Sequence, residues 1–238
     1  MNLESILFSQ GFGSRRQCRA LIEQARVAIH GAVCADALAE FDTTALVFTV
    51  DDVPWTFHAQ VYLALNKPAG YECSRAPQHH ASVFDLLPMQ FAARGVQCAG
   101  RLDQDTTGLL LLSDDGQFLH ECTSPRRKVP KTYIATTSQP IDDMQIRQLR
   151  CGVILRGESQ PVAAVSASAR EGDAHTLELT IGEGKYHQVK RMIAAVGNHL
   201  DALHRQRIGS FTLPDALRPG QWMWLDDAQR AASRNRWG

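Results

Sequence analysis

Residues 100–112, GRLDQDTTGLLLL, constrain the fold most strongly, because charged side chains of both signs stand directly before four consecutive leucines. The leucines lie between Gly108 and a D-D-G sequence at 114–116, and an apolar run between turn signals predicts a buried strand. The charged residues then form the turn that enters this strand. Either a carboxylate only caps that turn, or the turn holds a carboxylate that does chemistry.

The other patterns in the chain predict many strands and few helices. Strands are expected at 61–67, at 131–138, on both sides of the turn REGDA within 162–184, and at 203–213. The clearest helix is expected at 186–197, where apolar residues repeat at helical spacing and Gly197 suits the end. Strands and helices do not alternate regularly, which favours an α+β fold with a mixed, largely antiparallel sheet.

The first 60 residues predict a small separate unit. Ser14 and Gln17 fit the S-x-x-Q capping box, which opens a helix. RVAIHGAVC at 26–34 predicts a short hairpin. The segment DDVPWTFHAQ at 51–60 then predicts a boundary, after which the apolar strand of a second unit begins.

Composition bounds the class of protein without naming a function. The 238 residues carry no formal net charge, and 44% of them are hydrophobic, which is typical of a globular chain with a sizeable core. Six cysteines without a C-x-x-C pair predict free thiols, and therefore a cytoplasmic protein. No H-E-x-x-H or other ligand cluster predicts a metal site, and no apolar run is long enough to predict a membrane span.

Local charge is nevertheless uneven. Residues 1–30 hold four arginines against two acids, residues 185–207 hold five cations against one acid, and residues 126–131 hold four cations. If 203–213 is a strand, Leu203, Arg205 and Arg207 share one face. Ordinary surface charge explains each segment alone, but several basic segments around one groove are what binding to a phosphate backbone requires.

The two aspartates of the opening segment admit two interpretations. In an extended stretch Asp103 and Asp105 point to the same side, roughly 6–7 Å apart, which suits an acid/base pair of the glycosidase kind. One of them instead caps the turn through backbone amides. A carboxylate beside Arg101, and beside Lys190, has its charged form stabilised, which favours a nucleophile or base. Tyr133 is either a half-buried strand residue or a platform for a planar base.

At these residues the chain resembles the pseudouridine synthases. GRLDQDTTGLLLLSDDG is similar to the catalytic motif of that family, and NKPAG, KTY and GEGKYHQVKRM resemble its companion motifs in the same order. LESILFSQGFGSRRQCRALIEQARVAIHGAVC resembles an S4 RNA-binding module. The expected domains are therefore an S4-like RNA-binding domain at 1–58 and a catalytic domain at 59–238. The pair, with YHQVKRMIAAVGNHLDALHRQRIG, resembles the small-subunit ribosomal RNA branch.

The resemblance implies an isomerase that converts one uridine of ribosomal RNA, at a site of the uridine 516 type in 16S RNA, to pseudouridine. It implies a cytoplasmic monomer that needs no metal or other cofactor. Asp103 would start glycosidic cleavage on a flipped-out nucleotide, while Asp105 and the residues up to Gly108 shape the turn. Around it Arg101 would lie near the nucleotide, Tyr133 would stack on the uracil, Lys190 would pair with Asp103 and Leu203 would line the pocket. The expected RNA-binding residues are Ser14, Arg15, Arg16, Arg19, Arg26, Lys67, Lys131, Arg191 and Arg205.

Two positions depart from the family pattern, and three rival functions stay open. Glu4 stands where S4 modules commonly have a cation, and Lys185 replaces the commoner arginine, which conserves charge but loses bidentate geometry. The rivals are a synthase of the same family that acts on 23S RNA, a non-catalytic RNA-binding factor for ribosome assembly, and a metal-free glycosidase. The glycosidase needs a cleft rich in aromatic residues, and only 7% of the chain is aromatic.

Overall fold

The computed structural model describes residues 1–236 and divides into two compact units. The first comprises Met1–Val61 and Leu87–Gln97, and the second comprises Tyr62–Leu86 and the chain from Cys98 onward. The last two residues of the expected domain 59–238 lie outside the described residues. Both units combine helices with a sheet, so the predicted α+β class is confirmed.

The first unit is built on an antiparallel sheet of order β2-β1-β3-β4. Its elements are α1 (Leu3–Ser9), α2 (Arg15–Glu23), β1 (Val27–Ile29), β2 (Ala32–Val33), β3 (Val47–Val50), β4 (Val53–Thr56) and α3 (Met89–Ala93). The capping box of Ser14 and Gln17 is present at α2, and β1 and β2 form the predicted hairpin, so both predictions are confirmed. Phe91 of α3 lies 5.7 Å from Trp55 between ring centroids, which packs the segment around α3 into this unit.

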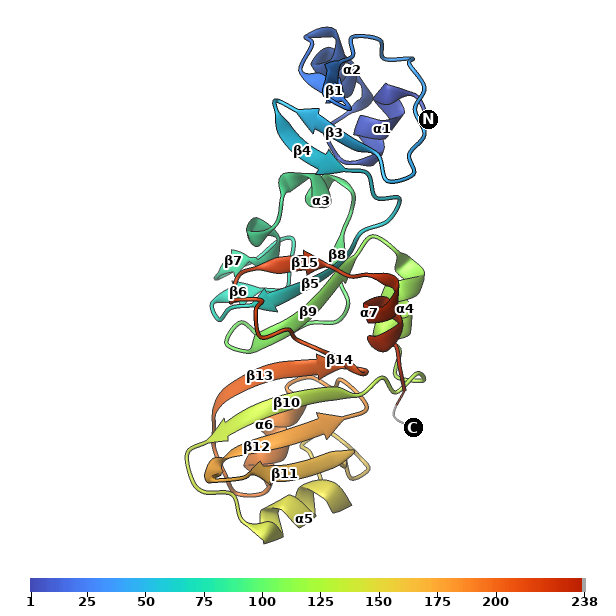
Figure 1. The fold of residues 1–238 in the computed structure, drawn as a ribbon. Helices are drawn as coiled ribbons and strands as arrows, with labels where there is room; N and C mark the ends of the chain where they lie inside the picture. Colours follow the sequence, from blue (N-terminus) through green and yellow to red (C-terminus); the bar gives the residue numbers. More distant parts are fainter. Residues whose placement is uncertain (237–238) are drawn as a thin grey trace. The chain divides into compact units, whose positions relative to one another are not determined.

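The second unit contains a sheet of order β11-β12-β10-β13-β9-β5-β15, with β14 beside β13 and β8 beside β9 (Figure 1). Along the order from β11 to β15 the neighbouring strands are antiparallel except β13 and β9, which are parallel, and β14 is antiparallel to β13. The strands are β5 (Tyr62–Lys67), β6 (Tyr71–Glu72), β7 (Ala81–Ser82), β8 (Gln97–Cys98), β9 (Thr107–Ser113), β10 (Lys131–Thr137), β11 (Ser166–Arg170), β12 (Asp173–Ile181), β13 (Leu200–Ile208), β14 (Phe211–Thr212) and β15 (Trp222–Trp224). The helices are η1 (Val83–Leu86), α4 (Gly116–Thr123), α5 (Asp143–Cys151), α6 (Gln188–Ala195) and α7 (Asp227–Ala232).

The leucine run forms the buried strand β9, as predicted, and all four leucines have no exposed surface. Strand β9 pairs along its length with β5 and in parallel with only two residues of β13. At that short junction Gly108 faces Arg205 with a φ of +101°, and a Cβ at Gly108 would lie 2.3 Å from the Arg205 carbonyl oxygen. Glycine is therefore required where the charged turn enters the strand.

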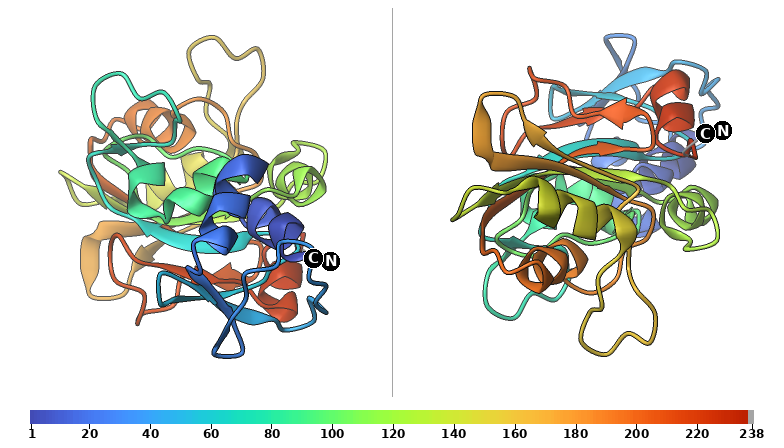
Figure 2. Two further views of the ribbon diagram at one scale, coloured as in Figure 1. Left: turned by 90° about the horizontal axis from the view of Figure 1, so that it is seen from above. Right: turned by 90° about the horizontal axis from the view of Figure 1, so that it is seen from below.

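Helices of the second unit cover the strands in pairs. Figures 1 and 2 show α5 and α6 on the same side of the sheet formed by β10 to β13, where Leu149, Met192 and Ile193 are buried. Figure 1 also shows α4 and α7 side by side, and Arg234 just beyond α7 donates to Glu121 of α4 at 2.8 Å. No helix within residues 1–236 has both the length and the apolar character that crossing a bilayer requires.

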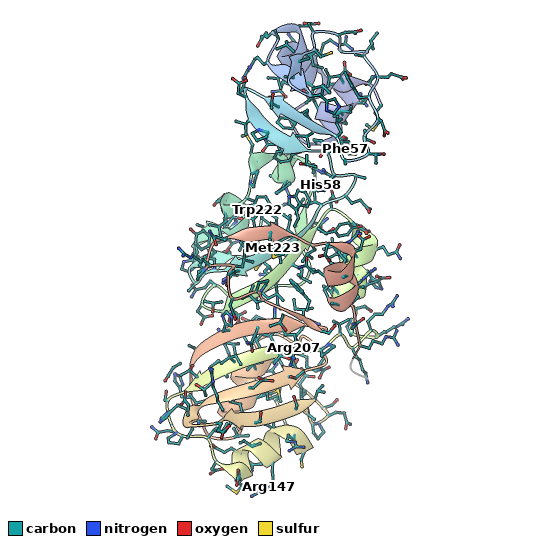
Figure 3. The ribbon with its side chains drawn as sticks, viewed as in Figure 1. Phe57, His58, Arg147, Arg207, Trp222 and Met223 are labelled. Atoms are coloured by element: carbon teal, nitrogen blue, oxygen red, sulfur yellow. The ribbon has the colours of Figure 1, made fainter. Side chains whose placement is uncertain are left out.

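A β-bulge in β13 changes one predicted face. The register shifts so that Tyr133 pairs with Arg205 but Thr132 pairs with Arg207. Because successive strand residues point to opposite faces, Arg207, labelled in Figure 3, lies on the other face from Arg205. Arg207 donates to the Thr132 hydroxyl at 3.2 Å, and its expected place on one face with Leu203 and Arg205 is wrong.

Candidate active site

A buried lysine holds the backbone of the charged turn. Lys67, at the end of β5, has no exposed surface, and its Nζ donates to the carbonyl oxygens of Asp103 at 3.0 Å, Gln104 at 3.1 Å and Thr106 at 2.9 Å. It also donates to the Pro68 carbonyl at 3.1 Å. Burial lowers the pKa of Lys67, although nearby acidic groups, including Asp103, oppose this shift. Lys67 is one of the expected RNA-binding residues, and in this structure its buried ammonium fixes the backbone of the turn.

The Asp103 carboxylate meets a different partner at each oxygen. Oδ2 lies 3.0 Å from Lys190 Nζ, and Oδ1 lies 3.2 Å from His187 Nε2. The Asp103 side chain keeps 29% of its surface exposed, so it is fixed in orientation and still open to a substrate. Both partners come from one place in the fold, because Lys190 stands in the first turn of α6 and His187 directly precedes that helix.

Asp105 shares the same lysine. Lys190 Nζ lies 2.7 Å and 2.9 Å from the two Asp105 oxygens. Partial burial works against the charge on Asp105, but the ammonium of Lys190 outweighs it and lowers the pKa of Asp105. Burial likewise works against the charge on Lys190, and the two carboxylates outweigh it and raise the pKa of Lys190. The Asp105 side chain thus holds Lys190, while Lys67 and a hydrogen bond from Thr106 N to Asp103 O at 3.1 Å close the turn.

His187 is the site residue that sequence reasoning missed. Its backbone is left-handed, with φ of 48°, and this conformation starts α6 at Gln188 rather than at the expected residue 186. A signal was present in the sequence, since His187 and Lys190 are three residues apart and would share one face of the helix expected at 186–197. In the structure both side chains contact Asp103.

The paired strands β10 and β13 bring together Tyr133, Leu203 and Arg205. Arg205 is only 2% exposed, and its guanidinium donates from Nε to the Leu109 carbonyl at 2.7 Å and from Nη1 to the Tyr133 hydroxyl at 3.4 Å. Its Nη2 has no hydrogen-bond partner among residues 1–236. Arg205, one of the expected RNA-binding residues, is therefore buried beside Tyr133.

Three other expected residues of this unit form no hydrogen bond or ion pair with Asp103 within residues 1–236. Arg101 is exposed and forms no ion pair with Asp103 or any other residue the structure describes, so it does not support the carboxylate. Lys131 is half-buried, donates to the Val129 carbonyl at 2.8 Å, and has its pKa lowered by burial to about 8. Arg191 donates to the backbone carbonyls of Arg156 and Tyr186.

The expected RNA-binding residues of the first unit cluster around α2. Ser14 uses its hydroxyl to cap that helix. Arg15 and Arg19 both pair with Glu4, at 3.3 Å and 2.8 Å, so the acid that departs from the S4 pattern holds two of the arginines. Arg26 pairs with Asp51 at 2.6 Å, whereas Arg16 is exposed.

The arrangement around Asp103 is suited to covalent or proton-transfer chemistry at a carboxylate. A carboxylate that is fixed by an ammonium and an imidazole, and is partly exposed, can attack an electrophile or remove a proton. Within residues 1–236, histidine, cysteine and acidic side chains form no group of three that could hold a metal ion.

Comparisons with known proteins identify the family of this chain. Residues 61–195 match the family described as RNA pseudouridylate synthase. The chain is 35% identical over 237 residues to the ribosomal small subunit pseudouridine synthase A of Pasteurella multocida, which covers 99% of this chain and 100% of that protein. It is 43% identical over 178 residues to the protein of the same name from Escherichia coli, over 74% of each chain.

A solved structure supports the same relationship over nearly the full length. It is described as a crystal structure of pseudouridylate synthase, shares 33% identity and superposes with a TM-score of 0.68 over 98% of this chain and 99% of that one. The family resemblance of the motifs is thereby confirmed. The chain belongs to the RNA pseudouridylate synthases.

Proposed function

We propose that this isomerase converts one uridine of small-subunit ribosomal RNA to pseudouridine and that Asp103 starts the reaction. The observation that carries the proposal is the Asp103 carboxylate, which Lys190 and His187 hold from two sides on a turn fixed by Lys67. The relatives named above, from Pasteurella multocida and Escherichia coli, are small-subunit enzymes by name, which supports the choice of RNA. We expect a target of the uridine 516 type.

The reaction needs cleavage of the bond from uracil N1 to the ribose, rotation of the base, and a new bond from C5, after which C5 loses a proton and N1 carries one. A uridine in folded RNA must first leave its stack, at a cost of a few kcal/mol. Asp103 begins the cleavage. Lys190 and His187 keep its carboxylate in one orientation, so little is lost to reorganisation when the substrate arrives.

The uracil pocket is formed in this proposal by β10 and β13. Tyr133 offers a ring for stacking, and Leu203, which is 8% exposed, offers an apolar wall. Arg205 holds the Tyr133 hydroxyl and keeps Nη2 as a donor for a uracil carbonyl. In this proposal Arg205 binds RNA as a residue of the uracil pocket.

Binding of the RNA outside the pocket falls to the basic residues of the first unit. We assign the domain 1–58 to RNA binding and the domain 59–238 to catalysis, with Arg15, Arg16 and Arg19 as the main backbone contacts. Because Glu4 already holds Arg15 and Arg19, we expect these two arginines to contribute less than free ones. We expect the protein to act as a monomer in the cytoplasm.

The test is tritium release from RNA that carries 5-tritiated uridine. We expect release from small-subunit RNA, at one nucleotide when the product is mapped by sequencing, and none from large-subunit RNA. Release from large-subunit RNA alone would move the target to 23S RNA. Binding without release from either RNA would contradict the proposal and favour the assembly factor.

A further inference from the structure

Tyr186 combines high exposure with a fixed ring. Its side chain is 77% exposed, and yet the ring stacks on His187 with centroids 3.8 Å apart and planes 18° apart. An isolated exposed tyrosine on a soluble surface needs no explanation. Tyr186 differs from such a residue in two ways. Its ring is ordered by stacking, and it directly precedes His187, a partner of the catalytic aspartate.

The backbone around Tyr186 fixes the position of its ring. Arg191 Nη1 donates to the Tyr186 carbonyl at 3.2 Å, and the Lys185 amide donates to the Gln188 side chain at 2.9 Å. His187 is held in turn by its 3.2 Å contact with Asp103. One face of the Tyr186 ring therefore lies on the imidazole, and the exposed remainder of the ring is preorganised for a second planar group.

In an enzyme that acts on RNA, the planar group that suits such a surface is an unpaired nucleobase. The target uracil itself belongs deeper, beside Tyr133, which is only 7% exposed. Tyr186 is much more exposed than Tyr133 and therefore lies outside that pocket. Its ring stacks on His187, and His187 in turn contacts Asp103. The base that reaches Tyr186 is therefore a neighbour of the target and not the target.

We propose that Tyr186 forms a second stacking site, which receives an unpaired base flanking the target uridine. This inference rests on the proposed function. The site takes purines and pyrimidines alike, because stacking uses the π face that every base has. Its role is to hold the flipped conformation of the RNA strand at the mouth of the pocket.

Steady-state kinetics of Tyr186→Ala, Tyr186→Phe and wild type on the small-subunit RNA test the proposal. We expect Tyr186→Ala to raise KM between about 5-fold and 100-fold and to leave kcat within about 2-fold. Tyr186→Phe keeps the ring and should match wild type. Met144→Ala, which removes another exposed apolar side chain in the same unit, is the matched control. A fall in kcat with an unchanged KM would overturn the proposal, because it would mean that Tyr186 only supports His187.

A fluorescence measurement separates this inference from the proposed function. 2-Aminopurine is placed on either side of the target uridine, and the Asp103→Asn protein is used so that no turnover occurs. We expect quenching at one flanking position with Tyr186 present, and loss of that quenching when Tyr186→Ala is added. Equal signals from the two proteins would refute the stacking site. Absence of pseudouridine formation by wild type would instead refute the proposed function, whatever the fluorescence shows.

Discussion

Two lysines near the same turn show how surroundings assign different roles to one residue type. Lys67 is fully buried among carbonyl oxygens, and burial lowers its pKa. Lys190 meets two carboxylates, which outweigh its partial burial and raise its pKa. Lys67 organises the backbone of the turn, and Lys190 neutralises and orients the carboxylates of Asp103 and Asp105.

Substitution of Lys190 tests that second role. We expect Lys190→Met to lower kcat by about 100-fold or more, because Asp103 and Asp105 lose the ammonium between them and repel one another. Lys190→Arg should recover part of the rate. The measurement is single-turnover pseudouridine formation at saturating enzyme. Lys185→Met, whose lysine pairs with Glu158, is the control, and an equal loss in both variants would contradict the assignment.

The lowered pKa of Lys131 predicts that the free energy of unfolding depends on pH. Burial lowers its pKa to about 8 from 10.5, so the unfolded chain binds more protons than the folded one between these values, and stability rises with pH there. Below pH 8 the charge costs about 3 kcal/mol at most. We expect Lys131→Met to unfold at higher urea concentration than wild type at pH 7, and this difference to shrink between pH 8 and 10.5. A difference that does not change with pH would contradict the shift.

At the scale of elements, the junction of β9 with β13 sets the geometry of the site. Only two residue pairs join these strands, and they place Gly108 against Arg205 directly after the charged turn. The turn therefore depends on a close approach of two backbones that are far apart in sequence. The same approach positions Arg205 to donate to Leu109 at 2.7 Å.

Gly108→Ala tests this junction. The added Cβ would lie 2.3 Å from the Arg205 carbonyl oxygen, and the φ of +101° is strained for alanine. We expect a loss of about 3 kcal/mol or more in the free energy of unfolding, measured in urea. Gly116→Ala, at the first turn of α4 with nothing near its Cβ, should change stability by about 1 kcal/mol or less. Equal midpoints for both variants would contradict the account of the junction.

Local signals in the sequence predicted the elements that depend on near neighbours. The leucine strand, the capping box at Ser14 and the hairpin at 26–34 are all read from a few adjacent residues. The bulge that turns Arg207 away, and the burial of Lys67 and Arg205, depend on contacts between residues 36 to 97 positions apart. A basic residue in a motif does not reveal whether it faces RNA or a carbonyl, so these roles could not be predicted from charge alone.

At the scale of the whole molecule, the neutral net charge conceals how the cations are used. Several cations expected to bind RNA are already paired within the protein, as Arg15 and Arg19 are with Glu4 and Arg26 is with Asp51. Arg16 has an exposed side chain. In the first unit, electrostatic binding therefore depends on the exposed Arg16 and on pairs that RNA must compete for.

The salt dependence of RNA binding measures that contribution. We expect simultaneous Arg15→Ala, Arg16→Ala and Arg19→Ala substitution to reduce the slope of log affinity against log salt by about 2. KM should rise while kcat stays within about 2-fold, because the first unit holds none of the residues around Asp103. Arg147→Ala in α5, labelled in Figure 3, is the control and should leave the slope unchanged. An unchanged slope in the triple variant would remove the first unit from RNA binding.

The central claim is that Asp103 does the chemistry and Asp105 supports it. Tritium release from small-subunit RNA, compared among wild type, Asp103→Asn and Asp105→Asn at saturating enzyme, tests this most directly. We predict that Asp103→Asn releases no tritium above background. Its affinity for RNA should stay within about 3-fold of wild type, and its free energy of unfolding in urea within about 1 kcal/mol. Asp105→Asn should react measurably but more slowly. Turnover by Asp103→Asn, or complete loss in both variants, would contradict the account.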